Sequence, residues 1–109
     1  MGSEGIAGVR VLIVEDEAMI AMLLQDMLEE MGCVVAATAA SLDDALRAAA
    51  AHPLDLAILD VNLGGTETYP VADALRRRGV PYVFSTGYGA STLHPDHQDR
   101  PTLQKPFVE

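Results

Sequence analysis

Four strand-like segments of this chain each end in a residue that can bind a metal ion or a phosphate group. Segments with few charged residues are expected where a strand is covered on both faces of a sheet. Because the carboxyl ends of parallel strands meet at one edge of an open sheet, the residues that close such segments converge there. The segments span residues 9–14, 54–59, 80–85 and 102–104, and they are closed by Glu15 with Asp16, Asp60, Thr86 and Lys105. The sequence therefore predicts carboxylates, a hydroxyl and an amine in one pocket.

Helix-like patterns alternate with these segments, which favours an α/β fold with a parallel sheet. From Glu17 onward, apolar residues recur at spacings of three and four, and Gly32 supplies a helix stop. Ser41 is expected to cap a second helix that runs to about residue 51. A third helix is expected to end at the arginines of residues 76–78. The apolar stripe of the first helix consists of Ile20, Leu23, Leu24, Met27, Leu28 and Met31.

Shorter segments complete the predicted chain. A further strand is expected over residues 33–38, and a turn over 62–66. Residues 87–101 contain glycines, prolines and histidines without an apolar stripe, so they are predicted to be mostly loop. The chain ends soon after its fifth strand, so the last helix is expected to be absent from it. The predicted domain spans residues 9–109 and is truncated at its C-terminus, and residues 1–8 are an N-terminal extension.

Composition limits the class of partner. The 109 residues contain 16 acidic and 7 basic side chains, a net charge of -9, which argues against nucleic acid or an anionic membrane as the main partner. No apolar stretch is long enough to span a bilayer, so the protein is expected to be cytoplasmic. The single cysteine, Cys33, is predicted to be a buried structural thiol. The three histidines, His52, His94 and His97, are predicted to be surface residues rather than metal ligands.

The predicted pocket has the residues that phosphoryl transfer needs. Asp60 is followed by Asn62, Gly64 and Gly65, so its carboxylate is expected in a loop where it can attack phosphorus and form an acyl phosphate. Carboxylates crowded together repel one another without a cation, and their hard oxygens suit Mg²⁺ or Mn²⁺. The predicted ligands are Glu15, Asp16, Asp60 and the backbone carbonyl of Asn62. Thr86 and Lys105 are predicted to bind the remaining phosphoryl oxygens.

Four motifs together resemble the receiver domain of two-component response regulators. They are VEDE at residues 14–17, LDVNL at 59–63, STG at 85–87 and KPF at 105–107. The resemblance implies a flavodoxin-like, doubly wound, five-stranded parallel sheet with strand order 2-1-3-4-5. It also implies that Asp60 is the phosphoacceptor, that a histidine kinase is the phosphoryl donor, and that Mg²⁺ is required. The domain would then signal by conformational change and protein contact, with self-phosphorylation and slow autodephosphorylation as its only activities.

The segment FSTGY at residues 84–88 resembles the Phe-Ala-Thr-Gly-Tyr signature of the FAT GUY receivers, which are often linked to HWE-type histidine kinases. Two departures from the ordinary receiver are visible. Thr102 stands where an aromatic switch residue is usual, and the pattern of residues 87–101 predicts that loop largely replaces the fourth helix. As a hypothesis, Tyr88 and the loop at 87–101 take over the switching role.

Other interpretations of the same residues remain. Asp16 could cap the first helix, Asp60 could cap a loop, and Lys105 could be a solvated lysine. A phosphohydrolase of the haloacid dehalogenase type also uses a strand-end aspartate, but it needs a second aspartate where this chain has Asn62. A receiver-like module that acts by protein interaction without phosphorylation is the remaining alternative.

Overall fold

The structure, a computed structural model, describes residues 7–86 and the strand at 102–104. The predictions for Tyr88, Lys105, His94 and His97 lie outside the described residues, as does the prediction of a loop at 87–101.

The described strands form one parallel sheet with the predicted strand order. Its order is β2-β1-β3-β6-β7, in which β6 and β7 are the fourth and fifth strands of the fold, so the order 2-1-3-4-5 is confirmed. Every neighbouring pair is parallel. The strands are β1 (Arg10–Val14), β2 (Val34–Ala39), β3 (Leu56–Asp60), β6 (Tyr82–Thr86) and β7 (Thr102–Gln104). Their bounds differ from the predicted ones by up to two residues.

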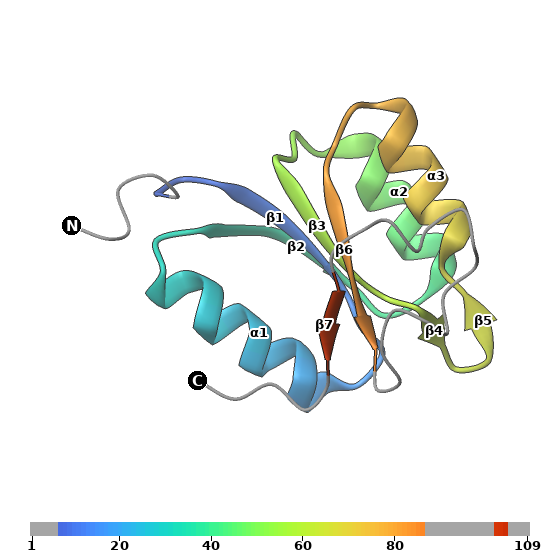
Figure 1. Ribbon diagram of the computed structural model, residues 1–109, viewed down its shortest axis with the longest axis horizontal. Helices are drawn as coiled ribbons and strands as arrows, with labels where there is room; N and C mark the ends of the chain where they lie inside the picture. The colour runs from blue at the N-terminus through green and yellow to red at the C-terminus, as the bar shows by residue number, and fades with distance from the viewer. Residues whose placement is uncertain (1–6, 87–101, 105–109) are drawn as a thin grey trace.

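Helices cover both faces of the sheet, as a doubly wound fold requires. Figure 1 shows α1 (Ala18–Glu30) on one face and α2 (Leu42–Ala51) with α3 (Tyr69–Arg77) on the other. The predicted cap of the second helix is confirmed, because Ser41 Oγ accepts a hydrogen bond from the Asp44 N–H at 3.2 Å. None of the helices within the described residues is long and apolar enough to cross a membrane.

The core lies in two layers, one on each face of the sheet. On the α1 face, Leu24 and Leu28 pack against Val11 and Ile13 of β1. Cys33 is buried in the same layer, as predicted. The prediction that Met31 lies on the buried stripe is wrong: this side chain is 48% exposed, because α1 ends at Glu30 and Met31 is its C-terminal cap.

On the other face, the core is built mainly around α2 and α3. Small alanines of α2 allow it to lie close to the sheet, and the aromatic rings of Tyr82 and Phe84 meet edge to face with centroids 5.6 Å apart. Both rings are buried. This layer fixes the strand β6 that leads to Thr86.

The predicted turn within residues 62–66 is confirmed at residues 64 and 65, and the structure adds that it joins the two short strands of an antiparallel hairpin. The hairpin consists of β4 (Asn62–Leu63) and β5 (Thr66–Glu67). Its loop contains Gly64 at φ 56° and Gly65 at φ 96°. Positive φ at both loop positions is the requirement of a type I′ turn, which two glycines meet without strain.

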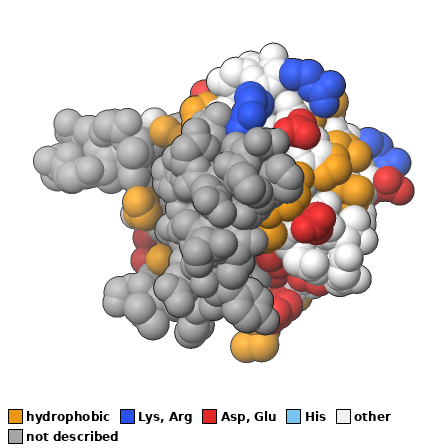
Figure 2. All heavy atoms as spheres, turned by 45° about the vertical axis from the view of Figure 1, so that its right-hand side comes forward, with side chains coloured by type: hydrophobic (Ala, Val, Ile, Leu, Met, Phe, Trp, Pro, Cys, Tyr) orange, Lys and Arg blue, Asp and Glu red, His pale blue; other side chains and the backbone are white. Residues whose placement is uncertain are grey.

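Charge is spread unevenly over the surface. On the face in Figure 2, Arg side chains gather in the upper part, towards the end at which α3 ends in Figure 1. The arginines at the end of α3 make hydrogen bonds within the protein. Arg76 donates to the Tyr82 hydroxyl at 2.9 Å, and Arg77 donates to the Asp73 carbonyl at 3.3 Å. Arg78 donates to the Ala49 carbonyl. We therefore attribute this basic group to the helix terminus.

Candidate metal and phosphoryl site

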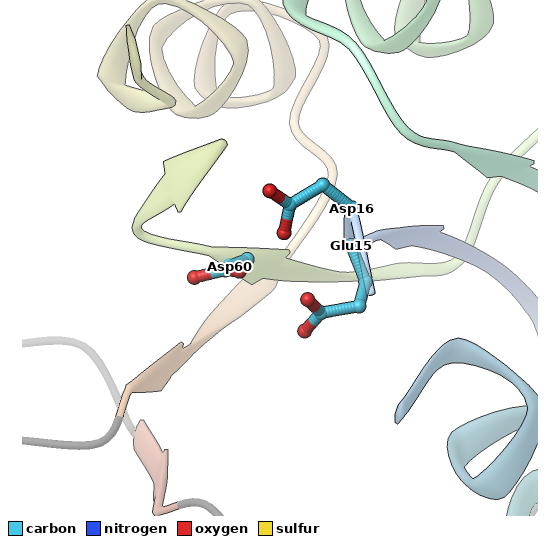
Figure 3. Close-up of side chains that lie close together, drawn as sticks. All are labelled: Glu15, Asp16 and Asp60. Carbon is cyan, nitrogen blue, oxygen red and sulfur yellow. The ribbon is translucent and has the colours of Figure 1, made fainter. Parts of the chain in front are cut away.

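Two neighbouring strands bring the predicted acidic residues to the same edge of the sheet. Val14 at the end of β1 is in register with Leu59 of β3, so the next residues on both strands lie side by side. The carboxylate oxygens of Glu15, Asp16 and Asp60 lie within 4.8 Å of one another. Figure 3 shows the three carboxylates gathered beyond the ends of the two strands. We call this cluster of three carboxylates the acidic site.

Local backbone groups hold two of these carboxylates. Glu15 is 4% exposed, and its Oε2 accepts a hydrogen bond from the Glu17 N–H at 3.1 Å. Asp60 is 8% exposed, and its Oδ1 accepts from the Asn62 N–H at 3.2 Å. Asp16, in contrast, is exposed. The site therefore consists of two buried acids that accept hydrogen bonds from the backbone, Glu15 and Asp60, and one solvent-exposed acid, Asp16.

The alternative role of Asp16 as a helix cap is wrong. The N-terminal cap position of α1 is occupied by Glu17, whose side chain makes no capping hydrogen bond and whose N–H donates to Glu15 rather than to Asp16. Asp16 lies instead beside the β4–β5 hairpin, where a Cβ placed on Gly64 would lie 3.8 Å from Asp16 Oδ2. The hairpin loop thus lies against the acidic site.

The donor set fits a small, hard divalent cation. Three carboxylates whose oxygens lie within 4.8 Å repel one another at neutral pH, and a cation between them removes that cost. Carboxylate oxygens are the ligands that Mg²⁺ and Mn²⁺ prefer. A pocket of about 270 Å³ opens beside Glu15 and Asp16, between the start of α1 and the end of β2. This pocket borders the acidic site on the side of Glu15 and Asp16.

Asn62 is placed by the hairpin. Its side-chain Oδ1 accepts a hydrogen bond from the Gly65 N–H at 2.7 Å, which holds the turn, while its backbone N–H donates to Asp60. The side chain at this position is an amide engaged within the loop, so it does not provide the second acid that a haloacid dehalogenase needs. The phosphohydrolase interpretation loses support for this reason.

Of the other two predicted site residues, Thr86 ends β6 and Lys105 follows β7 in the sequence. Asp60 is in register with Ser85 of β6, and Thr86 is in register with Gln104 of β7. The backbone of Thr86 therefore ends at the same sheet edge as Asp60. Gln104, the last residue of β7, directly precedes Lys105, which lies outside the described residues.

Two further residues at this edge were missed by the sequence analysis. Ser85 Oγ is buried and has no hydrogen-bond partner within the described part of the chain. Thr68 is fully buried, and its hydroxyl donates to the backbone carbonyl of Asp60 at 2.5 Å. The sequence offered a weak signal for Thr68, since a threonine two residues before Pro70 at a helix start suggests only an N-terminal cap.

A doubly wound parallel sheet with an acidic cluster at its carboxyl edge defines a class of α/β proteins that bind ligands at that edge. Residues 11–99 match the family model of the response regulator receiver domain. This chain therefore belongs to the receiver domains of response regulators, which are signalling domains of two-component systems.

Known relatives agree with this assignment. The chain is 34% identical over 102 residues to the transcriptional regulatory protein PdtaR of Mycobacterium tuberculosis, covering 90% of this chain and 50% of that protein. Among solved structures, it is similar to the solution structure of SdrG from Sphingomonas melonis Fr1, with 42% identity and a TM-score of 0.83 over 99% of this chain and 89% of that chain.

The BeF3-activated conformation of SdrG from Pseudomonas melonis Fr1 is also similar. Its identity is 45% and its TM-score 0.80, over 94% of this chain and 87% of that chain. The chain thus spans most of this solved receiver, but only about half the length of PdtaR.

Proposed function

We propose that a carboxylate oxygen of Asp60 accepts a phosphoryl group from a histidine kinase. That oxygen attacks the phosphorus atom while the bond between phosphorus and the imidazole nitrogen breaks. The electron pair of that bond returns to the imidazole nitrogen, which takes a proton from solvent. The observation that carries the proposal is the clustering of Glu15, Asp16 and Asp60 oxygens within 4.8 Å on a receiver fold.

Glu15, Asp16, Asp60 and the Asn62 carbonyl are the proposed metal ligands. A bound Mg²⁺ or Mn²⁺ ion would supply positive charge beside the phosphoryl oxygens. The hydrogen bonds from Glu17 and Asn62 hold the Glu15 and Asp60 carboxylates in place before any ligand arrives. Such preorganisation lowers the cost of assembling the site during the reaction.

Thr86 and Lys105 are proposed to bind the phosphoryl oxygens that the metal leaves free. The register of β3, β6 and β7 supports this assignment, because Asp60, Thr86 and the residue before Lys105 all lie at the carboxyl edge of the sheet. A hydroxyl and an ammonium group are both donors, and both suit a phosphoryl group with negative oxygens.

Intact-mass spectrometry tests the proposal. We expect the protein to gain one phosphoryl group after incubation with acetyl phosphate and Mg²⁺, and no gain after Asp60→Asn or with a chelator present. Asp26→Asn is a matched control, because Asp26 is an exposed aspartate of α1 outside the acidic site. If no phosphoryl group is gained while a control receiver is modified, the module that acts without phosphorylation becomes the better interpretation.

We also propose that the domain is a FAT GUY receiver in which Tyr88 is the switch residue. The support is the FSTGY segment at residues 84–88 and the 42% identity to SdrG. We expect the Tyr88 ring and the 87–101 segment to change environment when BeF3⁻ binds, measured by NMR or hydrogen exchange, and Tyr88→Ala to abolish that change. Equal spectra with and without BeF3⁻ would contradict this role.

An HWE-type histidine kinase is the proposed phosphoryl donor. The support is the same segment at residues 84–88, because FAT GUY receivers are often paired with kinases of that type. Transfer of labelled phosphate from purified HWE-type kinases, compared with kinases of other types, tests the pairing. Faster transfer from a kinase of another type would contradict it.

A further inference from the structure

Thr68 occupies the N-terminal cap position of α3 but does not cap the helix with its side chain. A threonine at this position usually accepts a hydrogen bond from an N–H of the first helical turn. Here no side-chain capping bond is made. The hydroxyl instead donates to the Asp60 carbonyl at 2.5 Å and lies 3.2 Å from the Val61 carbonyl. The side chain is 0% exposed, so solvent does not compete for these contacts.

The backbone of Thr68 adds further bonds to the same loop. Its N–H donates to the Val61 carbonyl at 3.0 Å, and its carbonyl accepts from the Val71 N–H at 2.9 Å and the Ala72 N–H at 3.2 Å. One residue thus joins the end of strand β3 to the first turn of α3. The backbone carbonyls of Asp60 and Val61 both point towards Thr68.

The register of the hairpin then decides which way Asn62 faces. In an antiparallel pair, hydrogen-bonded and non-hydrogen-bonded residue pairs alternate. Leu63 and Thr66 close the two-residue loop, and the bond from Thr68 to Val61 marks the second hydrogen-bonded position. The pair of Asn62 and Glu67 lies between these two hydrogen-bonded pairs, so it is a non-hydrogen-bonded pair. The N–H and the carbonyl of Asn62 therefore point away from β5. The Asn62 N–H indeed reaches Asp60 Oδ1.

We propose that Thr68 is a positioning residue that aims the Asn62 carbonyl and the Asp60 carboxylate at the metal. It acts by holding the Asp60 and Val61 carbonyls towards the start of α3. The Asn62 carbonyl is then left facing the acidic site. This inference rests on the proposed function, since it deepens the role of the same site.

The test uses the pair Thr68→Val and Thr68→Ser. Valine keeps the shape of threonine without the hydroxyl, and serine keeps the hydroxyl. We expect Thr68→Val to raise the Kd for Mg²⁺, measured by calorimetry, by about tenfold, as is typical when a group that orients a ligand is lost. Thr68→Ser is expected to stay near the wild-type value. The Mg²⁺ concentration that gives half-maximal phosphorylation should move in parallel, with a smaller change in the maximal rate.

A variant that only destabilises the fold supplies the control. Ser41→Ala removes a helix cap at α2 and leaves the Asp60 loop untouched, so its Mg²⁺ affinity should equal that of wild type at a temperature where both are folded. An unchanged Mg²⁺ Kd in folded Thr68→Val would overturn the inference. Failure of the wild type to be phosphorylated would overturn the proposed function instead, and the calorimetric measurement would still test Thr68.

A second pair of variants tests the hairpin if Thr68→Val does not fold. Gly65 and Gly79 both have positive φ, and a Cβ at either would meet no atom within 4 Å. Gly65→Ala and Gly79→Ala therefore introduce similar backbone strain, the first in the hairpin and the second after α3, where β6 is about to begin. We expect weaker Mg²⁺ binding for Gly65→Ala alone. Equal Mg²⁺ affinity in the two variants would contradict the role of the hairpin register.

Discussion

Asp60 and Ser85 are register partners on neighbouring parallel strands, and Ser85 carries a buried hydroxyl that has no hydrogen-bond partner within the described part of the chain. A buried hydroxyl without a partner costs free energy, because it gives up its bonds to water. We expect Ser85→Ala to raise the free energy of unfolding by about 1 kcal/mol, measured by urea denaturation. A loss of stability would mean that Ser85 Oγ makes a bond in solution.

The same chemical change should have the opposite effect at Ser41. Ser41 Oγ accepts the Asp44 N–H at 3.2 Å and caps α2. Ser41→Ala should lower the free energy of unfolding by about 1 kcal/mol, the usual value of such a cap. Far-UV circular dichroism during the same denaturation series would show whether the helix signal is lost in a single transition. Ser41→Asp should retain most of the stability, because aspartate also caps well.

Crowding of carboxylates predicts a stability that depends on the cation. Without Mg²⁺, Asp16→Asn should raise the melting temperature, because it removes one of the charges that repel at the acidic site. With Mg²⁺ in excess, wild type should gain stability as the logarithm of the Mg²⁺ concentration, and the variant should gain less. Asp26→Asn, which changes an exposed acid outside the site, should behave as wild type in both conditions. Calorimetric melting with and without Mg²⁺ measures the difference.

A surface ion pair predicts a loss of stability in acid. Arg10 donates to both carboxylate oxygens of Asp55, at 3.0 and 3.2 Å, and these bonds hold the pKa of Asp55 below its ordinary value. A carboxylate with a lowered pKa stabilises the fold at neutral pH, and this contribution is lost as the pH falls through its folded-state pKa. Both groups are solvent-exposed, so the contribution is small and screened by salt.

Arg10→Gln measures this contribution. The variant should lie below wild type in melting temperature at pH 7, and the two curves should approach each other as the pH falls below the ordinary range of an aspartate carboxyl. Added salt should narrow the gap at pH 7. A gap that stayed constant from pH 7 to strong acid would exclude the ion pair as its cause.

Features that depend on local pattern could be predicted from the sequence. The cap at Ser41, the stop at Gly32 and the strand β7 (Thr102–Gln104) follow from side-chain type and spacing, and the order of the sheet followed from the family resemblance. The gathering of Glu15, Asp16 and Asp60 was predictable as well, because parallel strands share one carboxyl edge. In these cases one physical rule decides the outcome.

Features that depend on competition between partners could not be predicted. The hydroxyl of Thr68 could bind its own helix or the Asp60 carbonyl, and only the packed fold selects the second. The two glycines at 64 and 65 indicated a turn, but pairing of Asn62 with Glu67 required knowledge of the register. The exposure of Met31 depended on where α1 ended, a boundary that periodicity leaves open by a few residues.

The strand that carries Asp60 is hydrogen-bonded along both of its sides, to β1 and to β6. Sliding β3 along its axis, or tilting it, would break two ladders at once, and its neighbours β1 and β6 are each held on both sides as well. A charge added to Asp60, the last residue of β3, therefore keeps a fixed position in the sheet. Any structural change in response to that charge therefore has to come from the loops and side chains around Asp60, while the strand that carries Asp60 stays in place.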